Sequence, residues 1–202
     1  FRPQGLALDG ELLYIADTEN HMIRRADLKA RTVSTIAGVG EQGSNRSHQP
    51  KPAKEAALNS PWDLWFREGK LYVAMAGPHQ IWLWNSATDE IHAFAGSGRE
   101  DIEDGEAQFA ALAQPSGLAS DGTHLFVADS EVSGIRTVLM ESGEVSTVVG
   151  LGLFEFGDVD GEGREVRLQH PLGVTWHDGV LYVADTYNNK IKAVDPFKRT
   201  SI

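Results

Sequence analysis

The chain has 202 residues, 41% of them hydrophobic, and a formal net charge of −11. It can bury a sizeable core, and because it contains no cysteine it excludes disulfides, thiolate catalysis and cysteine-ligated metals. No apolar run approaches the roughly 20 residues of a membrane helix, so we expect a soluble, cytoplasmic protein that does not enter a membrane. Acidic residues outnumber basic ones 29 to 18, which disfavours nucleic acid as a partner.

The first predicted unit, residues 1–40, starts at Pro3 with the short run GLAL and a turn at Asp9-Gly10. The apolar run LLYIA follows, then a polar turn, the alternating stretch MIRRADL and the run TVSTIAG. Alternation and glycine turns of this kind predict four antiparallel strands.

The same order recurs in residues 59–98, 113–152 and 169–202, which start at prolines 58, 54 and 56 residues apart. The second strand reads LYIAD, LYVAM, LFVAD and LYVAD in the four copies. Long connectors, residues 41–58, 99–112 and 153–168, separate the copies. Repetition of a four-stranded unit predicts an all-β fold in which each copy is one blade of a β-propeller.

These residues resemble the NHL-repeat family, whose blades run from a proline and glycine through an LYVAD-type strand to a turn with asparagine. Residues 1–40, 113–152 and 169–202 match well, and 59–98 matches with departures. The connectors DGEAQFAALAQP and DGEGREVRLQHP are similar to linkers of NHL proteins that also carry a thioredoxin-like domain. The resemblance implies a six-bladed ring, of which residues 1–202 supply a segment of about three and a half blades.

The blades could also form a complete ring without further blades. An open array leaves two apolar faces exposed, so four blades closing on themselves are the alternative.

The aspartate of LYVAD is the first candidate for chemistry, since Asp17, Asp129 and Asp185 occupy equivalent places. Equivalent blade positions point into different sectors of a ring, which argues against a shared site. Aspartate accepts backbone N–H groups in tight turns, and Asn20 and Asn188 suit the same geometry. We interpret these five residues as structural turn residues.

Two histidines share a repeat position and are weak candidates for zinc. His21 and His79 each stand eighteen residues after their proline, but the other copies have Ser133 and Asn189 there. A three-histidine zinc site would need a third ligand from elsewhere in the protein. We therefore prefer to interpret His21 and His79 as solvated turn residues.

Acidic residues in the last connector are weak candidates for calcium. Asp158, Asp160 and Glu162 alternate through GDVDGEG, but Gln169 stands where an EF-hand loop needs its closing acid. We therefore expect no cofactor, with zinc or calcium as the lesser alternatives.

The second copy breaks the template. Asp63 replaces the glycine of the other copies, Met75 replaces the aspartate, and Trp62 and Trp82 lie nearby in the pattern. These four residues are candidates for a groove that binds a cationic or amphipathic partner, with repacking of the core as the alternative.

Taken together, the pattern favours a non-enzymatic scaffold that binds a protein or peptide on the face carrying the long connectors. The first alternative is a metal-dependent lyase or lactonase-like enzyme with a site in the central channel. The second is RNA binding. The sequence does not indicate an oligomeric state.

Overall fold

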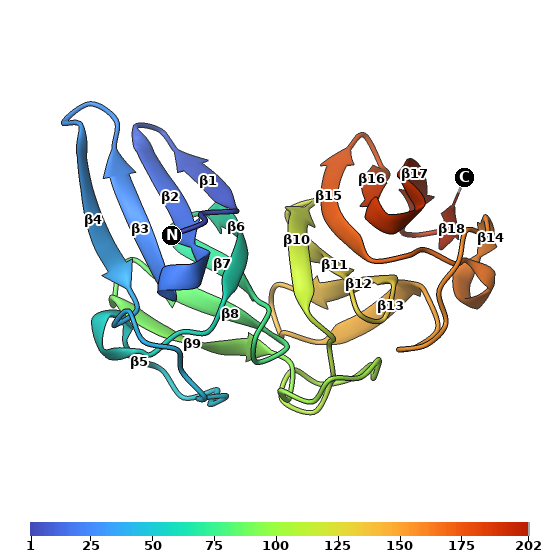
Figure 1. Ribbon diagram of the computed structural model, residues 1–202, viewed down its shortest axis with the longest axis horizontal. Helices are drawn as coiled ribbons and strands as arrows, with labels where there is room; N and C mark the ends of the chain where they lie inside the picture. The colour runs from blue at the N-terminus through green and yellow to red at the C-terminus, as the bar shows by residue number, and fades with distance from the viewer. Residues whose placement is uncertain (202) are drawn as a thin grey trace.

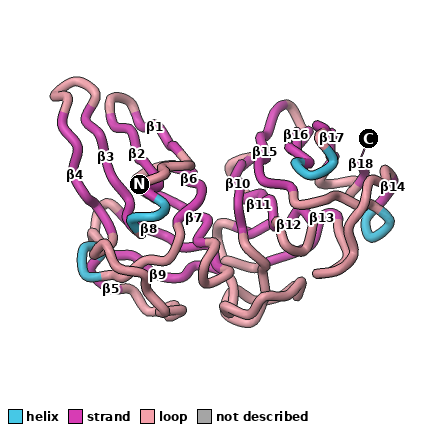
Figure 2. Tube along the Cα trace, in the orientation of Figure 1, coloured by secondary structure: helices cyan, strands magenta, loops and turns pink. Residues whose placement is uncertain are grey.

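The computed structural model describes residues 1–201, which form four antiparallel sheets joined by loops and short 3-10 turns (Figures 1 and 2). The described part contains no α-helix, and none of its helical turns could cross a bilayer. The prediction of an all-β propeller is therefore confirmed.

Each sheet is one blade. Blade 1 comprises β1 (Leu6–Asp9), β2 (Leu12–Asp17), β3 (Met22–Asp27) and β4 (Thr32–Ala37). Blade 2 comprises β6 (Pro61–Arg67), β7 (Lys70–Met75), β8 (Gln80–Asn85), β9 (Glu90–Ala95) and the short β5 (Lys51–Pro52). Blade 3 comprises β10 (Pro115–Ser120), β11 (His124–Asp129), β12 (Gly134–Leu139) and β13 (Val145–Val149). Blade 4 comprises β15 (Pro171–His177), β16 (Val180–Asp185), β17 (Lys190–Asp195), β18 (Thr200–Ser201) and the short β14 (Gly161–Glu162).

The blades are arranged as an open arc. The first strand of each blade is innermost, and β6 contacts both β1 and β10, while β10 contacts β15. Blades 1 and 4 stand apart at the two ends of the arc in Figure 1. A self-closed ring of four blades is therefore wrong for this chain.

Three buried clusters fill the spaces between successive blades. Alternation along β7 explains how one blade serves two of them, because Leu71 and Val73 pack in the cluster with blade 1, whereas Tyr72 and Ala74 pack in the cluster with blade 3. Inner blades are thus apolar on both faces.

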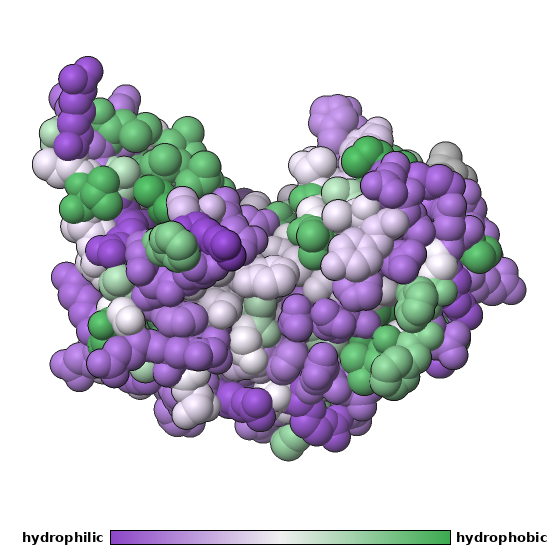
Figure 3. All heavy atoms as spheres, in the orientation of Figure 1, coloured by the Kyte–Doolittle hydropathy of each residue, from purple (hydrophilic) through white to green (hydrophobic). Residues whose placement is uncertain are grey.

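The terminal blades present their other face to solvent. Leu6, Leu8 and Val33 of blade 1 are 57%, 61% and 65% exposed, and Ile191 of blade 4 is 69% exposed. Figure 3 shows the hydrophobic surface over blade 1 at the upper left. Exposed apolar sheet faces of this kind are what a segment of a larger ring leaves uncovered.

The glycine two residues after the repeat proline lets the innermost strands approach each other. A Cβ on Gly5 would lie 2.4 Å from the Cα of Asp63, and the Gly5 N–H donates to the Trp62 carbonyl at 2.8 Å. The inner strands of blades 1 and 2 therefore touch backbone to backbone.

The connectors add something that the sequence did not predict, because each pairs with the outermost strand of the blade it enters. β5 pairs with β9, β14 pairs with β18, and Gly105 forms an isolated bridge with Val145 of β13. The Asp-Gly-Glu opening of two connectors thus marks an edge-pairing segment. Each connector then crosses its blade to reach the innermost strand.

Candidate functional site on the connector face

The antiparallel order of the strands places the three connectors on one side of the arc, together with the turns that follow β2, β7, β11 and β16. We call this side the connector face, and the side with the short glycine hairpins the hairpin face. Contacts join turns to connectors directly, since the Asn188 amide donates to the Gly157 carbonyl at 2.6 Å and the Gln80 amide to the Arg46 carbonyl at 3.1 Å.

The LYVAD aspartates fasten the connectors. Asp129 accepts the N–H of Ala113 at 2.7 Å, and Asp185 accepts the N–H of Gln169 at 2.7 Å. Each donor lies two residues before the proline that starts the innermost strand of the same blade. Asp17 likewise accepts from the nitrogen of Phe1, two residues before Pro3.

The turns themselves are held differently from the prediction. Asp17 and Asp185 make no side-chain cap to the backbone of the helical turns that follow them. Instead the Asn20 amide donates to Asp17 at 3.0 Å, and the Asn188 amide donates to Asp185 at 2.7 Å. The aspartates therefore organise the turn through asparagine and the connector through its backbone.

A basic residue seven places after each of these aspartates completes the arrangement and was not predicted from the sequence. Arg24 donates to Asp17 at 3.0 Å, and Arg136 donates to Asp129 at 3.1 Å. The equivalent base of blade 4, Lys192, contacts the connector instead. The constant spacing of seven residues was the available signal.

The pair in blade 3 is fully enclosed. The Asp129 and Arg136 side chains are both 0% exposed, and Arg136 also contacts Asp104 at 2.9 Å. Burial raises the pKa of Asp129 to about 6, in spite of the neighbouring guanidinium. Asp104 also accepts a hydrogen bond from the Thr147 hydroxyl. Burial raises the pKa of Asp104, but the hydrogen bonds from Thr147 and Arg136 and the charge of Arg136 lower it by more, so the pKa is lowered overall.

Blade 2 replaces the charged pair by an apolar one. Met75 and Trp82 stand at the positions of aspartate and arginine, and they are 0% and 1% exposed in the cluster shared with blade 1. Trp82 donates its ring N–H to Gln80 at 3.1 Å. Both side chains are closed to solvent, so they do not line a surface groove.

The other two groove candidates lie on the innermost strand. Trp62 and Asp63 are partly exposed, and Asp63 accepts the N–H groups of Leu64 at 2.9 Å and of Leu118 in blade 3 at 2.8 Å. Burial raises the pKa of Asp63. Its carboxylate therefore ties blade 2 to blade 3 at a place where the other copies have glycine, whereas Met75 and Trp82 are enclosed in the cluster shared with blade 1.

The two histidines join successive blades. The Nδ1 atom of His21 accepts the N–H of Ser60 at 3.1 Å, and that of His79 accepts the N–H of Gln114 at 3.1 Å. Ser133 makes the same contact through its hydroxyl, which accepts the N–H of His170 at 3.3 Å. Burial lowers the pKa of His79. One ring nitrogen of each histidine is thus occupied.

The acidic residues of the last connector form ion pairs with blade 4. Lys192 contacts Asp158 at 2.8 Å and Asp160 at 2.5 Å, and Lys190 contacts Asp158. The pairing with lysine lowers the pKa of Asp158. Within residues 1–201, no three His, Asp or Glu side chains gather in an arrangement that could hold a metal ion.

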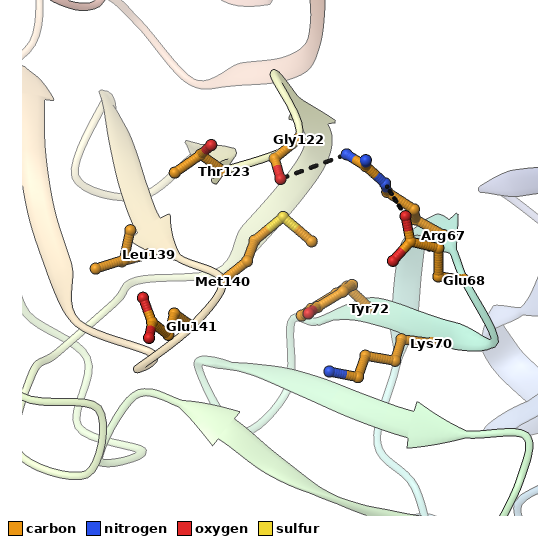
Figure 4. Close-up of a pocket in the computed structure, with 9 residues that line it drawn as sticks. All are labelled: Arg67, Glu68, Lys70, Tyr72, Gly122, Thr123, Leu139, Met140 and Glu141. Carbon is orange, nitrogen blue, oxygen red and sulfur yellow. Dashed lines mark hydrogen bonds and ion pairs between the residues drawn. The ribbon is translucent and has the colours of Figure 1, made fainter.

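One hollow opens between blades 2 and 3 on the hairpin face. It encloses about 340 Å³, and Tyr72 and Met140 line it together with charged side chains. Figure 4 shows the Arg67 guanidinium reaching the Gly122 carbonyl at 3.4 Å beside Glu68. Its two bases are balanced by two glutamates, so this hollow has no dominant charge with which to select a ligand.

A larger hollow of about 500 Å³ lies on the connector face of blade 2. It is lined by polar and small residues of the connector 41–58 and of the turn after β7, among them Gln42, Arg46 and Asn59. The connector face therefore offers both loops and a hollow at the same place.

The fold, together with the repeated contacts of the LYVAD aspartates with turn and connector, defines a β-propeller built of NHL-type blades. No protein-family model matches the sequence. NHL repeat-containing protein 2 of Bos taurus is 46% identical over 96% of this chain, which spans 31% of that protein. The Arabidopsis thaliana protein SUPPRESSOR OF QUENCHING 1, chloroplastic, is 44% identical over 96% of the chain, which spans 20% of its length.

Solved structures agree on the fold. A Bacteroides thetaiotaomicron protein of unknown function superposes with a TM-score of 0.75 at 22% identity, over 95% of this chain and 46% of that one. A streptogramin B lyase superposes with a TM-score of 0.60 at 11% identity, over 98% of this chain and 53% of that one. The chain belongs to the NHL-repeat β-propeller family.

Proposed function

We propose that the connector face of this propeller scaffold binds a protein or peptide and that the described blades carry out no chemistry of their own. The observation that supports this most is the fastening of the connectors. Their sequences differ, yet in all three the turn residue of the previous blade accepts the N–H next to the proline. In the connectors that enter blades 3 and 4, an aspartate also accepts the N–H two residues before that proline. Variable loops on a rigid frame are where recognition is usually built.

The polar groups that a catalytic reading would use have structural partners. The LYVAD aspartates and their bases fasten the connectors, and His21 and His79 each hold a backbone N–H of the next blade. These contacts favour a scaffold over the lyase or lactonase-like alternative. Because the same fold carries a lyase elsewhere, the fold itself does not decide between them.

The chain spans about a third of NHL repeat-containing protein 2, so the activity and partners of a whole protein of this kind belong to the proposal as well. We keep the cytoplasm as the proposed location, because a chain without cysteine suits a reducing compartment.

Site-specific photocrosslinking tests the proposal. A photoreactive residue is placed at Gln42 on the connector face and, as a matched control, at Thr123 on the hairpin face. We expect protein crosslinks from position 42 and none from position 123. Crosslinks from position 123 alone would contradict the proposal.

The alternatives have their own measurements. Stoichiometric zinc or calcium in the purified protein, lost together with an activity on chelation, would establish the enzyme. Retention of labelled RNA at low salt, released by added salt, would establish RNA binding, which the net charge of −11 disfavours.

A further inference from the structure

The connector before blade 4 carries an apolar run that its counterparts lack. After the repeated Gly-x-Gly, this connector reads LFEF at 153–156, where the other two read EQGS at 41–44 and REDI at 99–102. Phe154 is 86% exposed and Phe156 is 53% exposed. Two solvent-exposed phenylalanines, separated by one glutamate on a polar loop, mark an interaction surface.

The backbone around these phenylalanines is held in place. Glu155 donates its N–H to the Gly152 carbonyl at 3.3 Å, and Gly157 donates its N–H to the Leu168 carbonyl at 2.9 Å. The Asn188 amide also donates to Gly157 at 2.6 Å. The phenylalanines are therefore presented by a fixed loop, and Figure 3 shows hydrophobic surface over the region where the chain leaves β13.

A groove lies beside this run. It has a volume of about 410 Å³ and lies between the connectors 99–112 and 153–168, with Ile102 and Leu151 as its apolar lining and Glu103, Asp104, Arg164 and Arg199 as its charged lining. Leu151 links the groove to the exposed phenylalanines through two residues of chain. Apolar anchors beside a lined groove are the common form of a peptide-docking site.

The surrounding charge selects the occupant. The connector 99–112 has five carboxylates and one arginine, and 153–168 has five carboxylates and two arginines. Within the structure that residues 1–201 define, Glu100, Asp101, Glu106 and Glu162 make no ion pair. A second copy of this chain, with its net charge of −11, and RNA are both repelled by such a surface, whereas a basic segment is attracted.

We propose that Phe154, Phe156 and the adjoining groove dock a basic, amphipathic segment of a protein partner, with its apolar side chains on the phenylalanines and its basic ones toward the unpaired acids. Arg164 and Arg199 hold backbone carbonyls of that segment inside the groove. The proposal rests on the function proposed above, because it names a docking site built mainly from two connectors and one class of partner for it. Arg199, in the β17–β18 hairpin, completes the lining of the groove at the rim.

A binding experiment with defined peptides tests it. The probe is a short fluorescent peptide in which lysine alternates with leucine, and its partner probe has glutamate in place of lysine. Binding of both to the protein is measured by fluorescence anisotropy at two salt concentrations. The variants are Phe154→Ala/Phe156→Ala and, as a matched control, Phe197→Ala, which removes a phenylalanine that is 64% exposed on the hairpin face.

We expect the lysine peptide to bind, the glutamate peptide not to bind, and added salt to weaken the affinity. The Phe154→Ala/Phe156→Ala variant should lose at least about tenfold in Kd, as buried aromatic anchors do, and Phe197→Ala should lose nothing. Circular dichroism should show both variants folded, since these side chains are exposed.

Two results overturn the proposal. One is binding of the lysine peptide that Phe154→Ala/Phe156→Ala leaves unchanged or that Phe197→Ala weakens equally. The other is no binding of the lysine peptide at all. If crosslinking from Gln42 still captures a partner in either case, the proposed function stands and only this site and partner class are wrong.

Discussion

Replacing Arg136 by methionine should destabilise the protein far more than the same change at Arg24. Arg136 is 0% exposed and donates to Asp129, to Asp104 and to the carbonyls of Ala111 and Glu103. Arg24 is 30% exposed, and its acidic partner Asp17 is 12% exposed. The two positions are equivalent in the repeat, so the comparison sets an enclosed arginine with four partners against a partly exposed one with two.

The magnitude follows from what each change leaves behind. Arg136→Met leaves the fully buried Asp129 carboxylate without its ion-pair partner, and losing one partner of a buried pair costs about 3–5 kcal/mol. At Arg24 water can replace the lost contact, so we expect about 1 kcal/mol or less.

Blade 2 suggests how the loss at Arg136 is recovered. The double variant Asp129→Met/Arg136→Trp copies the pair Met75 and Trp82 and removes both buried charges. It still leaves the Ala113 N–H without its acceptor, which costs about 1–3 kcal/mol. We expect the double variant to be more stable, by about 2 kcal/mol or more, than the summed losses of Asp129→Met alone and Arg136→Trp alone would give.

The assay is urea unfolding followed by far-UV circular dichroism, since the new tryptophan would disturb fluorescence. Additivity of the two single changes within about 0.5 kcal/mol, or an equal loss at Arg24, would refute the reasoning.

The pH dependence of stability gives a further check on Arg136→Met. The pKa of Asp129 is raised to about 6 even with Arg136 present, so folded Asp129 holds a proton that the unfolded chain releases above pH of about 4. Stability of that variant should fall as pH rises through this window and beyond.

Three further predictions concern single positions and bound metal. Burial lowers the pKa of His79, so as pH falls the unfolded chain binds a proton before the folded one does. The free energy of unfolding should therefore decrease as pH drops below about 6.5. His79→Ser, which copies Ser133, should flatten that part of a pH series of unfolding midpoints. Gly5→Ala should cost about 3 kcal/mol or more in urea unfolding, because its Cβ meets Asp63 at 2.4 Å, whereas Gly10→Ala meets nothing within 4 Å and should cost about 1 kcal/mol; equal losses would show that the close approach does not matter. Dialysis against a chelator should leave the thermal unfolding midpoint unchanged. A drop of several degrees would show that bound zinc or calcium stabilises the protein.

Repetition made the fold predictable. Prolines at a regular spacing, glycine turns and the LYVAD strand are local signals, and each recurs often enough to reveal the four-stranded blade. The open arc needed the structure, because the same strands could have closed on themselves. The edge-pairing segments β5 and β14 were missed because each is two residues long and carries no alternation of its own.

The candidate site was harder to predict for a physical reason. The pattern left Met75 and Trp82 open to two interpretations, a binding groove or repacking of the core, and the structure shows a buried apolar replacement for an aspartate and a base seven residues apart. That relation joins neighbouring strands, so it is visible only when both positions are compared across all four copies. The exposure of Phe154 could not be read from sequence, because an apolar residue in a connector is equally compatible with packing against a blade.

The pairing of each connector with the outer strand of the blade it enters gives these loops a second duty. A sheet edge with unpaired N–H and C=O groups is a template for association with another chain, and β5 and β14 cover the edges of β9 and β18. A connector must therefore reach the rim before it returns to the centre, so its length is set by the width of a blade. Deletions that leave the loop able to join the two inner strands would still uncover the rim, and their first symptom should be aggregation rather than unfolding.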